Sequence, residues 1–132
     1  MDLGELKKQF FLEARTHRSF SSKKIEDSKL HEIYELAKFG PTQNNFCPMR
    51  ITFVKSPEAK QKLIEVASEG NRPKIESAPV TIIIAYDIKY YQYIHLLAPH
   101  MDASKIEIQA ETERDKLARE LSWLQAGYVL VA

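Results

Sequence analysis

The segment from Ala78 to Tyr86 constrains the fold of this chain more than any other, since it reads Ala-Pro-Val-Thr-Ile-Ile-Ile-Ala-Tyr without one charged residue. A nearly continuous apolar run that is rich in β-branched residues predicts a strand buried on both faces. The segment Arg50–Lys55 alternates apolar and polar residues, which predicts a second strand. We therefore expect a central sheet.

Three helices are predicted before and between these strands, from the spacing of apolar residues and from helix-terminating signals. They cover residues 3–15, 27–40 and 56–70. Gly40-Pro41 terminates the second helix, while Ser56 caps the third, with Pro57 at its first position. We expect the third helix to bury Leu63, Ile64, Val66 and Ala67.

The segment Tyr90–Ala103 is aromatic and irregular, so we expect it on the surface as a loop or a short helix. Two roles stay open for its tyrosines, lining a substrate pocket or covering a dimer surface, and we favour the second. From about Ile106 the pattern is helical again. The order helix, helix, strand, helix, strand, helix indicates an α/β or α+β domain, and we predict a single domain over residues 1–132.

The last predicted helix is charged at first and then apolar around most of its circumference. Its large apolar residues cannot all face one core stripe, and a helix of this kind must be buried on most sides. They are Leu121, Trp123, Leu124, Tyr128, Val129, Leu130 and Val131. We therefore expect the protein to form oligomers, and the chain to be the truncated N-terminal portion of a longer subunit.

Charge and composition argue against several function classes. Nineteen Lys and Arg against eighteen Asp and Glu give a net charge of +1 without a basic stripe, so we expect no nucleic-acid partner. The uncharged stretches are shorter than the ~20 residues that span a bilayer, and we expect no membrane partner. A single cysteine, Cys47, suits a reducing compartment and predicts a cytoplasmic protein. His95 and His100 lack the spacing of a helical zinc site, so no metal site is predicted.

The first of three polar clusters is Arg15-Thr16-His17-Arg18-Ser19. Its guanidiniums, hydroxyls and imidazole can surround an anion, with arginine supplying a planar fork of donors. The same residues also fit a solvated helix end, where the helix dipole favours arginine.

The second cluster, Gly40–Pro48, is a proline-bracketed loop whose amides and hydroxyl can recognise the edge of a heteroaromatic ring. A plain connecting loop explains the same residues. The third cluster, Glu69–Lys74, again places an amide and cations at a helix end.

Taken in order, these clusters resemble the flavin-dependent nitroreductase superfamily. The resemblance rests on Arg15-Thr-His17, on Gly40-Pro-Thr-Gln-Asn-Asn-Phe-Cys-Pro48, and on Gly70-Asn71 with Lys74 before Ala78-Pro-Val. It runs from about Leu12 to the last residue and includes the block Gln125-Ala-Gly-Tyr128. The subgroup that the chain most resembles contains malonic semialdehyde reductase and the NADH dehydrogenase/NAD(P)H nitroreductases.

The resemblance implies an α+β fold, the N-terminal portion of a three-layer α/β/α sandwich that forms an intertwined homodimer. It implies one FMN in each of two sites at the dimer interface and NAD(P)H as the reductant. Hydride would pass through flavin N5 to a small-molecule acceptor, either malonic semialdehyde (3-oxopropanoate) or a nitro or quinone compound. Because the flavin carries the reaction, no catalytic side chain is predicted.

The resemblance also assigns the cofactor-binding residues. Arg15, Thr16 and His17 fall where the family holds the FMN phosphate and ribityl chain. The isoalloxazine would be approached from the other subunit by Pro41, Thr42, Gln43 and Asn45. Asn71 and Lys74 fall on the loop near the pyrimidine edge, where a cation would stabilise the negative charge of reduced flavin.

The sequence departs from the wider family at two motif positions, Ser19 and Cys47. Many members carry a second arginine in place of Ser19 and a glutamine in place of Cys47. We interpret Cys47 as a packed small residue rather than a reactive thiol, since no neighbouring base is visible in the sequence. An alternative function follows from the expected truncation, namely a non-catalytic remnant of such a reductase.

Overall fold

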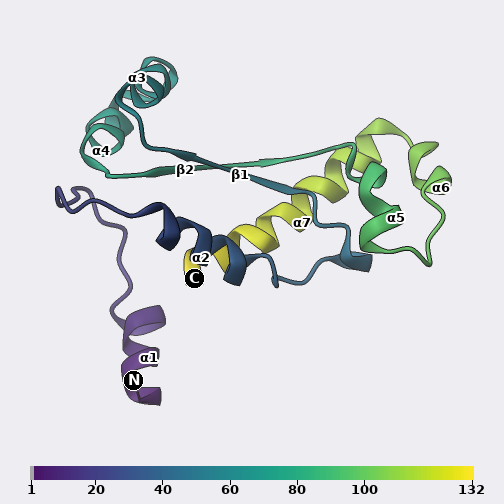
Figure 1. Cartoon of the computed structure of the whole chain (residues 1–132), viewed down its shortest axis with the longest axis horizontal. Helices are drawn as coiled ribbons and strands as arrows, with labels where there is room; N and C mark the ends of the chain where they lie inside the picture. The colour runs from purple at the N-terminus through teal and green to yellow at the C-terminus, as the bar shows by residue number, and fades with distance from the viewer. Residues whose placement is uncertain (1) are drawn as a thin grey trace. The chain divides into compact units, whose positions relative to one another are not determined.

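The computed structural model of the protein describes residues 2–132 (Figure 1). The chain forms two compact units. Unit 1 contains the segment up to Ile25 together with Val54–Thr81. Unit 2 contains Glu26–Phe53 and Ile82–Ala132.

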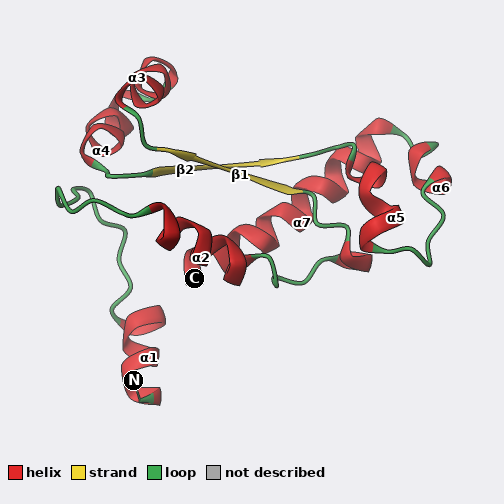
Figure 2. Cartoon of the chain, viewed as in Figure 1, coloured by secondary structure: helices red, strands yellow, loops and turns green. Residues whose placement is uncertain are grey.

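The sheet has two strands, β1 (Met49–Val54) and β2 (Thr81–Tyr86), which run antiparallel (Figure 2). Just beyond the strand ends, the Asp87 amide donates to the Pro48 carbonyl at 3.0 Å. Both predicted strands are confirmed, but the prediction that β2 is buried on both faces is wrong, since its last four residues are exposed. Helix α7 covers β2 incompletely and leaves an apolar hollow of about 200 Å³ against it.

In unit 1, helix α1 (Leu3–Lys7) continues as a π-helix over Lys8–Leu12. A capping box holds its start, because the Asp2 carboxylate accepts from the Glu5 amide and the Glu5 carboxylate accepts from the Asp2 amide. The helix ends at Leu12 rather than near Arg15, and it has no buried residue.

The second part of unit 1 contains α3 (Pro57–Val66), which packs against the helix that follows it. The predicted cap is confirmed, since the Ser56 hydroxyl accepts from the Ala59 amide at 3.2 Å. The predicted end is wrong, because Ala67 adopts an extended conformation and stops the helix. A 3₁₀ turn (Glu69–Asn71) and helix α4 (Arg72–Ser77) follow. The expected burial is also wrong, since Leu63, Ile64 and Ala67 are only half-buried and 81% of Val66 is exposed.

In unit 2, helix α2 (Asp27–Ala37) packs along α7 (Glu111–Val131). Leu30 and Ala37 form the buried part of α2. The chain leaves α2 through Gly40, which lies against Tyr128 of α7 so closely that a Cβ atom there would be 2.9 Å from the ring.

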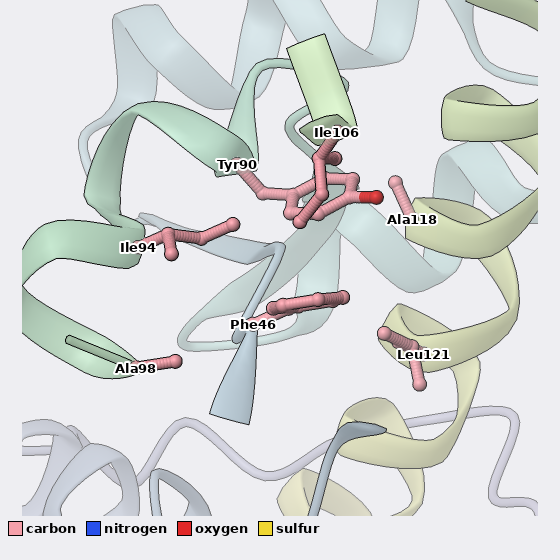
Figure 3. Close-up of a cluster of buried hydrophobic side chains, with 7 residues drawn as sticks. All are labelled: Phe46, Tyr90, Ile94, Ala98, Ile106, Ala118 and Leu121. Carbon is pink, nitrogen blue, oxygen red and sulfur yellow. The ribbon is translucent and has the colours of Figure 1, made fainter. Parts of the chain in front are cut away.

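The core of unit 2 lies where α7 meets α5 (Ile94–Leu97), α6 (Ser104–Glu107) and the 3₁₀ turn Tyr90–Tyr93 (Figure 3). Its members are Phe46, Tyr90, Ile94, Ala98, Ile106, Ala118 and Leu121. The surface position predicted for residues 90–103 is therefore wrong for part of that segment. Tyr90, Ile94 and Ala98 recur at steps of four residues and form one buried helical face.

Within the described residues, helix α7 buries a single stripe, so the predicted burial on most sides stays a prediction that needs cover from outside them. The stripe consists of Ala118, Leu121, Ser122, Gln125, Ala126 and Val129. Trp123 is 73% exposed and Leu130 is 87% exposed. That a second subunit covers these exposed side chains in an oligomer stays a prediction. The single-domain organisation also stays a prediction. The predicted order of helices and strands is confirmed, with short helical turns added between them.

Candidate functional site

The loop between α2 and β1 adopts an unusual backbone conformation. Three of its residues that are not glycine have positive φ angles, Asn44 at 50°, Asn45 at 57° and Cys47 at 44°. Asparagine tolerates this left-handed region, whereas a cysteine there must be held by its surroundings. Residues held in sparsely populated conformations gather at functional sites, which makes this loop a candidate site.

Hydrogen bonds inside the loop join two of the predicted site residues. The Cys47 amide donates to the Thr42 hydroxyl at 3.1 Å, and the Cys47 thiol donates to the Asn45 side-chain carbonyl at 3.2 Å. Asn45 also donates to the Leu97 carbonyl at 2.8 Å, which fixes the loop to α5. Thr42 and Asn45 are therefore placed relative to each other by Cys47, which supports its interpretation as a structural residue.

Two buried residues anchor the loop, and its predicted site residues are more exposed. Phe46 enters the core, and Pro48 is fully buried. Pro41, Gln43 and Asn45 are exposed, and Thr42 is half-buried. The loop thus presents a hydroxyl and two amide groups from a rigid base.

Arg50, at the start of β1, makes contacts that sequence reasoning missed. Its guanidinium donates to the Cys47 carbonyl at 3.1 Å and to the Met49 carbonyl at 2.9 Å. It also pairs with the Asp87 carboxylate at 2.9 Å. The available signal was an arginine directly beside a polar loop, but its role depends on an aspartate on a distant segment.

Gln125 of α7 is the second missed residue. It is buried, with 3% of its surface exposed, and its side-chain carbonyl accepts from the Met49 amide at 3.1 Å. A polar residue inside the uncharged second half of α7 was the signal that could have marked it, because buried polar groups require partners.

A hollow of about 840 Å³ lies beside the loop within unit 2. Its wall is mainly apolar and aromatic, with a few polar groups, as expected for a site that holds a ring system. The wall includes Tyr34, Lys38, Phe39, Asn45, Cys47, Met49, Arg50, Ile51, Phe53, Tyr93, Leu96, Leu97 and Gln125.

The predicted anion cluster lies in unit 1, directly after the π-helix, and Arg15, Thr16 and His17 are all exposed. The Arg15 guanidinium donates to the Ala14 carbonyl at 2.6 Å and to the Leu12 carbonyl at 3.2 Å. Arg15 and His17 line a shallow depression that also contains acidic side chains, so its charge is mixed.

The third predicted pair is brought together by a direct hydrogen bond. The Lys74 ammonium donates to the Asn71 side-chain carbonyl at 3.1 Å. Asn71 is exposed at the end of the 3₁₀ turn, and Lys74 is half-buried on the first turn of α4. The pair presents a cation and an amide from one short stretch of backbone.

Two other site types receive no support from the described part of the chain. Within residues 2–132, no group of three His, Cys, Asp or Glu side chains is placed to hold a metal ion. No helix in the same range is both long and apolar enough to cross a membrane.

Sequence comparison connects the chain to known proteins. The sequence model of the Nitroreductase family matches residues 12–132. A protein named "Putative NADH dehydrogenase/NAD(P)H nitroreductase" from Burkholderia lata is 41% identical over 94% of this chain and 64% of the relative. A protein of the same name from Ralstonia nicotianae is 40% identical with the same coverage. The chain thus spans less than two thirds of the length of these curated relatives.

Comparison with solved structures gives the same fold. A crystal structure titled "putative nitroreductase in complex with FMN", from Exiguobacterium sibiricum, matches 99% of this chain and 69% of that chain. Its TM-score is 0.81 at 19% identity. A "putative NAD(P)H:FMN oxidoreductase" from Staphylococcus epidermidis also gives a TM-score of 0.81, over 98% of this chain and 67% of that one, at 19% identity. The predicted nitroreductase-like α+β fold is therefore confirmed.

Proposed function

Because this chain belongs to the Nitroreductase family, we propose that the protein is an FMN-dependent oxidoreductase that takes hydride from NAD(P)H. Relatives that are named NAD(P)H nitroreductases and are up to 41% identical support this activity. A structural relative crystallised with FMN supports the cofactor. When bound, the flavin would supply the hydride chemistry at N5.

The observation that carries the proposal is the fixed loop beside an apolar hollow. Thr42 and Asn45 are held by Cys47 on a backbone with three left-handed residues. Such a loop keeps polar groups at set positions toward a planar ring, without the entropy cost of ordering them on binding. We assign the isoalloxazine contacts to this loop of the other subunit, at Pro41, Thr42, Gln43 and Asn45.

We assign the phosphate, the ribityl chain and the pyrimidine edge of the cofactor to the two other predicted clusters. Arg15, Thr16 and His17 would hold the phosphate and ribityl chain, since a guanidinium and a hydroxyl suit phosphate oxygens. Asn71 and Lys74 would meet the pyrimidine edge. The hydrogen bond from Lys74 to Asn71 restricts the position of the Lys74 ammonium. This cation would stabilise negative charge on the reduced ring.

The proposed electron acceptor is malonic semialdehyde, with a nitro compound or a quinone as alternatives. The resemblance to the malonic semialdehyde reductase subgroup supports the first. The hollow of about 840 Å³ beside the loop suits a small molecule rather than a macromolecule, and so does the absence of a basic stripe in the sequence.

We further propose that the protein works as a homodimer in the cytoplasm. Large exposed apolar side chains such as Trp123 and Leu130 on α7 support a second copy as the partner. The single cysteine, Cys47, suits a reducing compartment.

The test is oxidation of NADH and NADPH by the purified protein with FMN, compared with the same concentration of free FMN. We expect sustained turnover with the protein that exceeds the free-cofactor rate. We expect Lys74→Met to reduce that rate, whereas Lys62→Met, on an exposed position of α3, leaves it unchanged. A wild-type protein that binds FMN but turns over no faster than free FMN would instead support the non-catalytic remnant.

A further inference from the structure

We propose that Arg50 is the positioning residue of the loop at Pro41–Cys47, and that its guanidinium holds Cys47 in the conformation that aims Thr42 and Asn45 at the flavin. The inference rests on the proposed function for the identity of the ligand. The role of Arg50 in holding the loop rests on contacts within unit 2 alone.

The guanidinium of Arg50 lies where the loop joins the sheet. One terminal nitrogen donates to both the Cys47 and the Met49 carbonyls, and the other pairs with Asp87 at 2.9 Å. Its central carbon also lies 5.1 Å from the centre of the Tyr93 ring, within range of a cation–π contact. Arg50 thus joins the loop, the segment after β2 and the turn before α5.

Cys47 is the residue of this loop that needs such support. Its φ of 44° is disfavoured for a residue with a Cβ atom other than asparagine or aspartate. A charge-assisted hydrogen bond to its carbonyl opposes rotation of the peptide plane that follows Cys47. On the other side, the Cys47 amide donates to Thr42 and its thiol donates to Asn45. The contacts therefore run from Arg50 through Cys47 to both flavin-facing side chains.

Asp87 orients the guanidinium independently of the loop. Its side chain is 27% exposed, and its second oxygen accepts from the Lys89 amide at 2.8 Å. A lysine at position 50 would have a single ammonium group in place of this planar fork, so it could not reproduce the same set of contacts. The geometry therefore favours arginine at position 50 over a general cation.

The chain carries its own reporter of this loop, because Cys47 is its one cysteine. The rate at which an aromatic disulfide reagent labels the thiol, without FMN, measures how often the loop opens. We expect Arg50→Met to label about tenfold faster than wild type, given the strength of hydrogen bonds to charged groups. Arg50→Lys should be intermediate. The matched control, Arg119→Met on an exposed position of α7, should label at the wild-type rate.

A second measurement links the loop to the ligand. We expect Arg50→Met to weaken FMN binding and to shift the visible spectrum of the bound flavin, with partial recovery in Arg50→Lys. Asp87→Asn, which keeps the shape but removes the charge, should move both readouts in the same direction and by less. Circular dichroism and thermal unfolding show whether each variant has kept its fold. If Arg50→Met does not fold, Asp87→Asn provides the test instead.

The results separate this inference from the proposed function. If folded Arg50→Met and Asp87→Asn are labelled at the wild-type rate, the positioning role is overturned, whether or not their FMN affinity changes. Faster labelling in both variants with unchanged FMN affinity and spectrum would also overturn it, since the loop would then not position the ligand. A wild-type protein that fails to bind FMN contradicts the proposed function, while the labelling rates still test the role of Arg50 in the loop.

Discussion

The side-chain carbonyl of Gln125 accepts a hydrogen bond from the Met49 amide at 3.1 Å. This contact joins the middle of α7 to the residue at which the candidate loop enters β1. Since Gln125 is buried, the bond forms away from solvent and both groups depend on it. Helix α7 therefore stabilises the loop directly as well as contributing to the core.

Replacing Gln125 with leucine should destabilise the protein, because the Met49 amide would lose its acceptor in a partly buried setting. We expect the free energy of unfolding to fall by about 1–3 kcal/mol. Urea denaturation measures it, and Gln61→Leu on an exposed face of α3 is the control. Equal midpoints for Gln125→Leu and wild type would show that the bond does not contribute.

Replacing each of two glycines with alanine should change the free energy of unfolding in opposite directions. At Gly40 a Cβ atom would be 2.9 Å from the Tyr128 ring, so Gly40→Ala should cost about 1–3 kcal/mol through overpacking. At Gly127, inside α7, the added carbon would have no atom within 4 Å apart from its chain neighbours and the nearby backbone of the helix, and alanine should stabilise by about 0.5–1 kcal/mol. Thermal unfolding of both variants checks the pair. A stable Gly40→Ala would show that Tyr128 moves away freely.

The local signals of the sequence predicted most of the elements. Ser56-Pro57 marks the start of α3, and both β-rich segments form strands. Tertiary placement could not be read in the same way. The apolar sequence of β2 is typical of a strand buried on both faces. The burial of its side chains, however, depends on which other segments, α7 among them, pack against the strand. Tyr90 looked like part of an irregular surface segment, since its core partners lie on a helix much later in the chain.

For the candidate site, too, local residue types could be predicted from the sequence, whereas contacts between distant segments could not. The residue types of Thr42, Asn45, Asn71 and Lys74 are visible in the sequence. In the structure Cys47 links Thr42 to Asn45, and Lys74 donates directly to Asn71. The residues that hold the loop around Thr42 and Asn45 were not predicted. Arg50 and Asp87 are distant in sequence, and a pattern within one segment carries no information about such a pair. The left-handed backbone of Cys47 likewise has no signature in its residue type.

The Tyr86 hydroxyl donates to the Asp115 carboxylate at 2.9 Å, and this bond raises the pKa of Tyr86 above its ordinary value. A raised pKa in the folded state means that the bond stabilises the fold below the unfolded-state pKa, about 10. The contribution is lost as the pH rises through the folded-state value. The difference in unfolding free energy between wild type and Tyr86→Phe should therefore be constant up to about pH 9 and shrink above 10. A difference that is independent of pH up to alkaline conditions contradicts this account.

Tyr90 should tolerate the loss of its hydroxyl. The ring lies fully buried against Phe46 (Figure 3), and within residues 2–132 its hydroxyl has no hydrogen-bond partner. Burying an unpaired polar group is unfavourable. We expect Tyr90→Phe to be neutral or to stabilise by about 1 kcal/mol in chemical denaturation. A loss of stability would reveal a partner for the hydroxyl, such as a buried water.

Titration of the purified protein with FMN, followed by flavin absorbance and fluorescence, tests the proposed FMN dependence. We expect saturable binding, a yellow protein after removal of free cofactor, and weaker binding in Arg15→Met and Lys74→Met. A folded wild-type protein that stays colourless in excess FMN would contradict it.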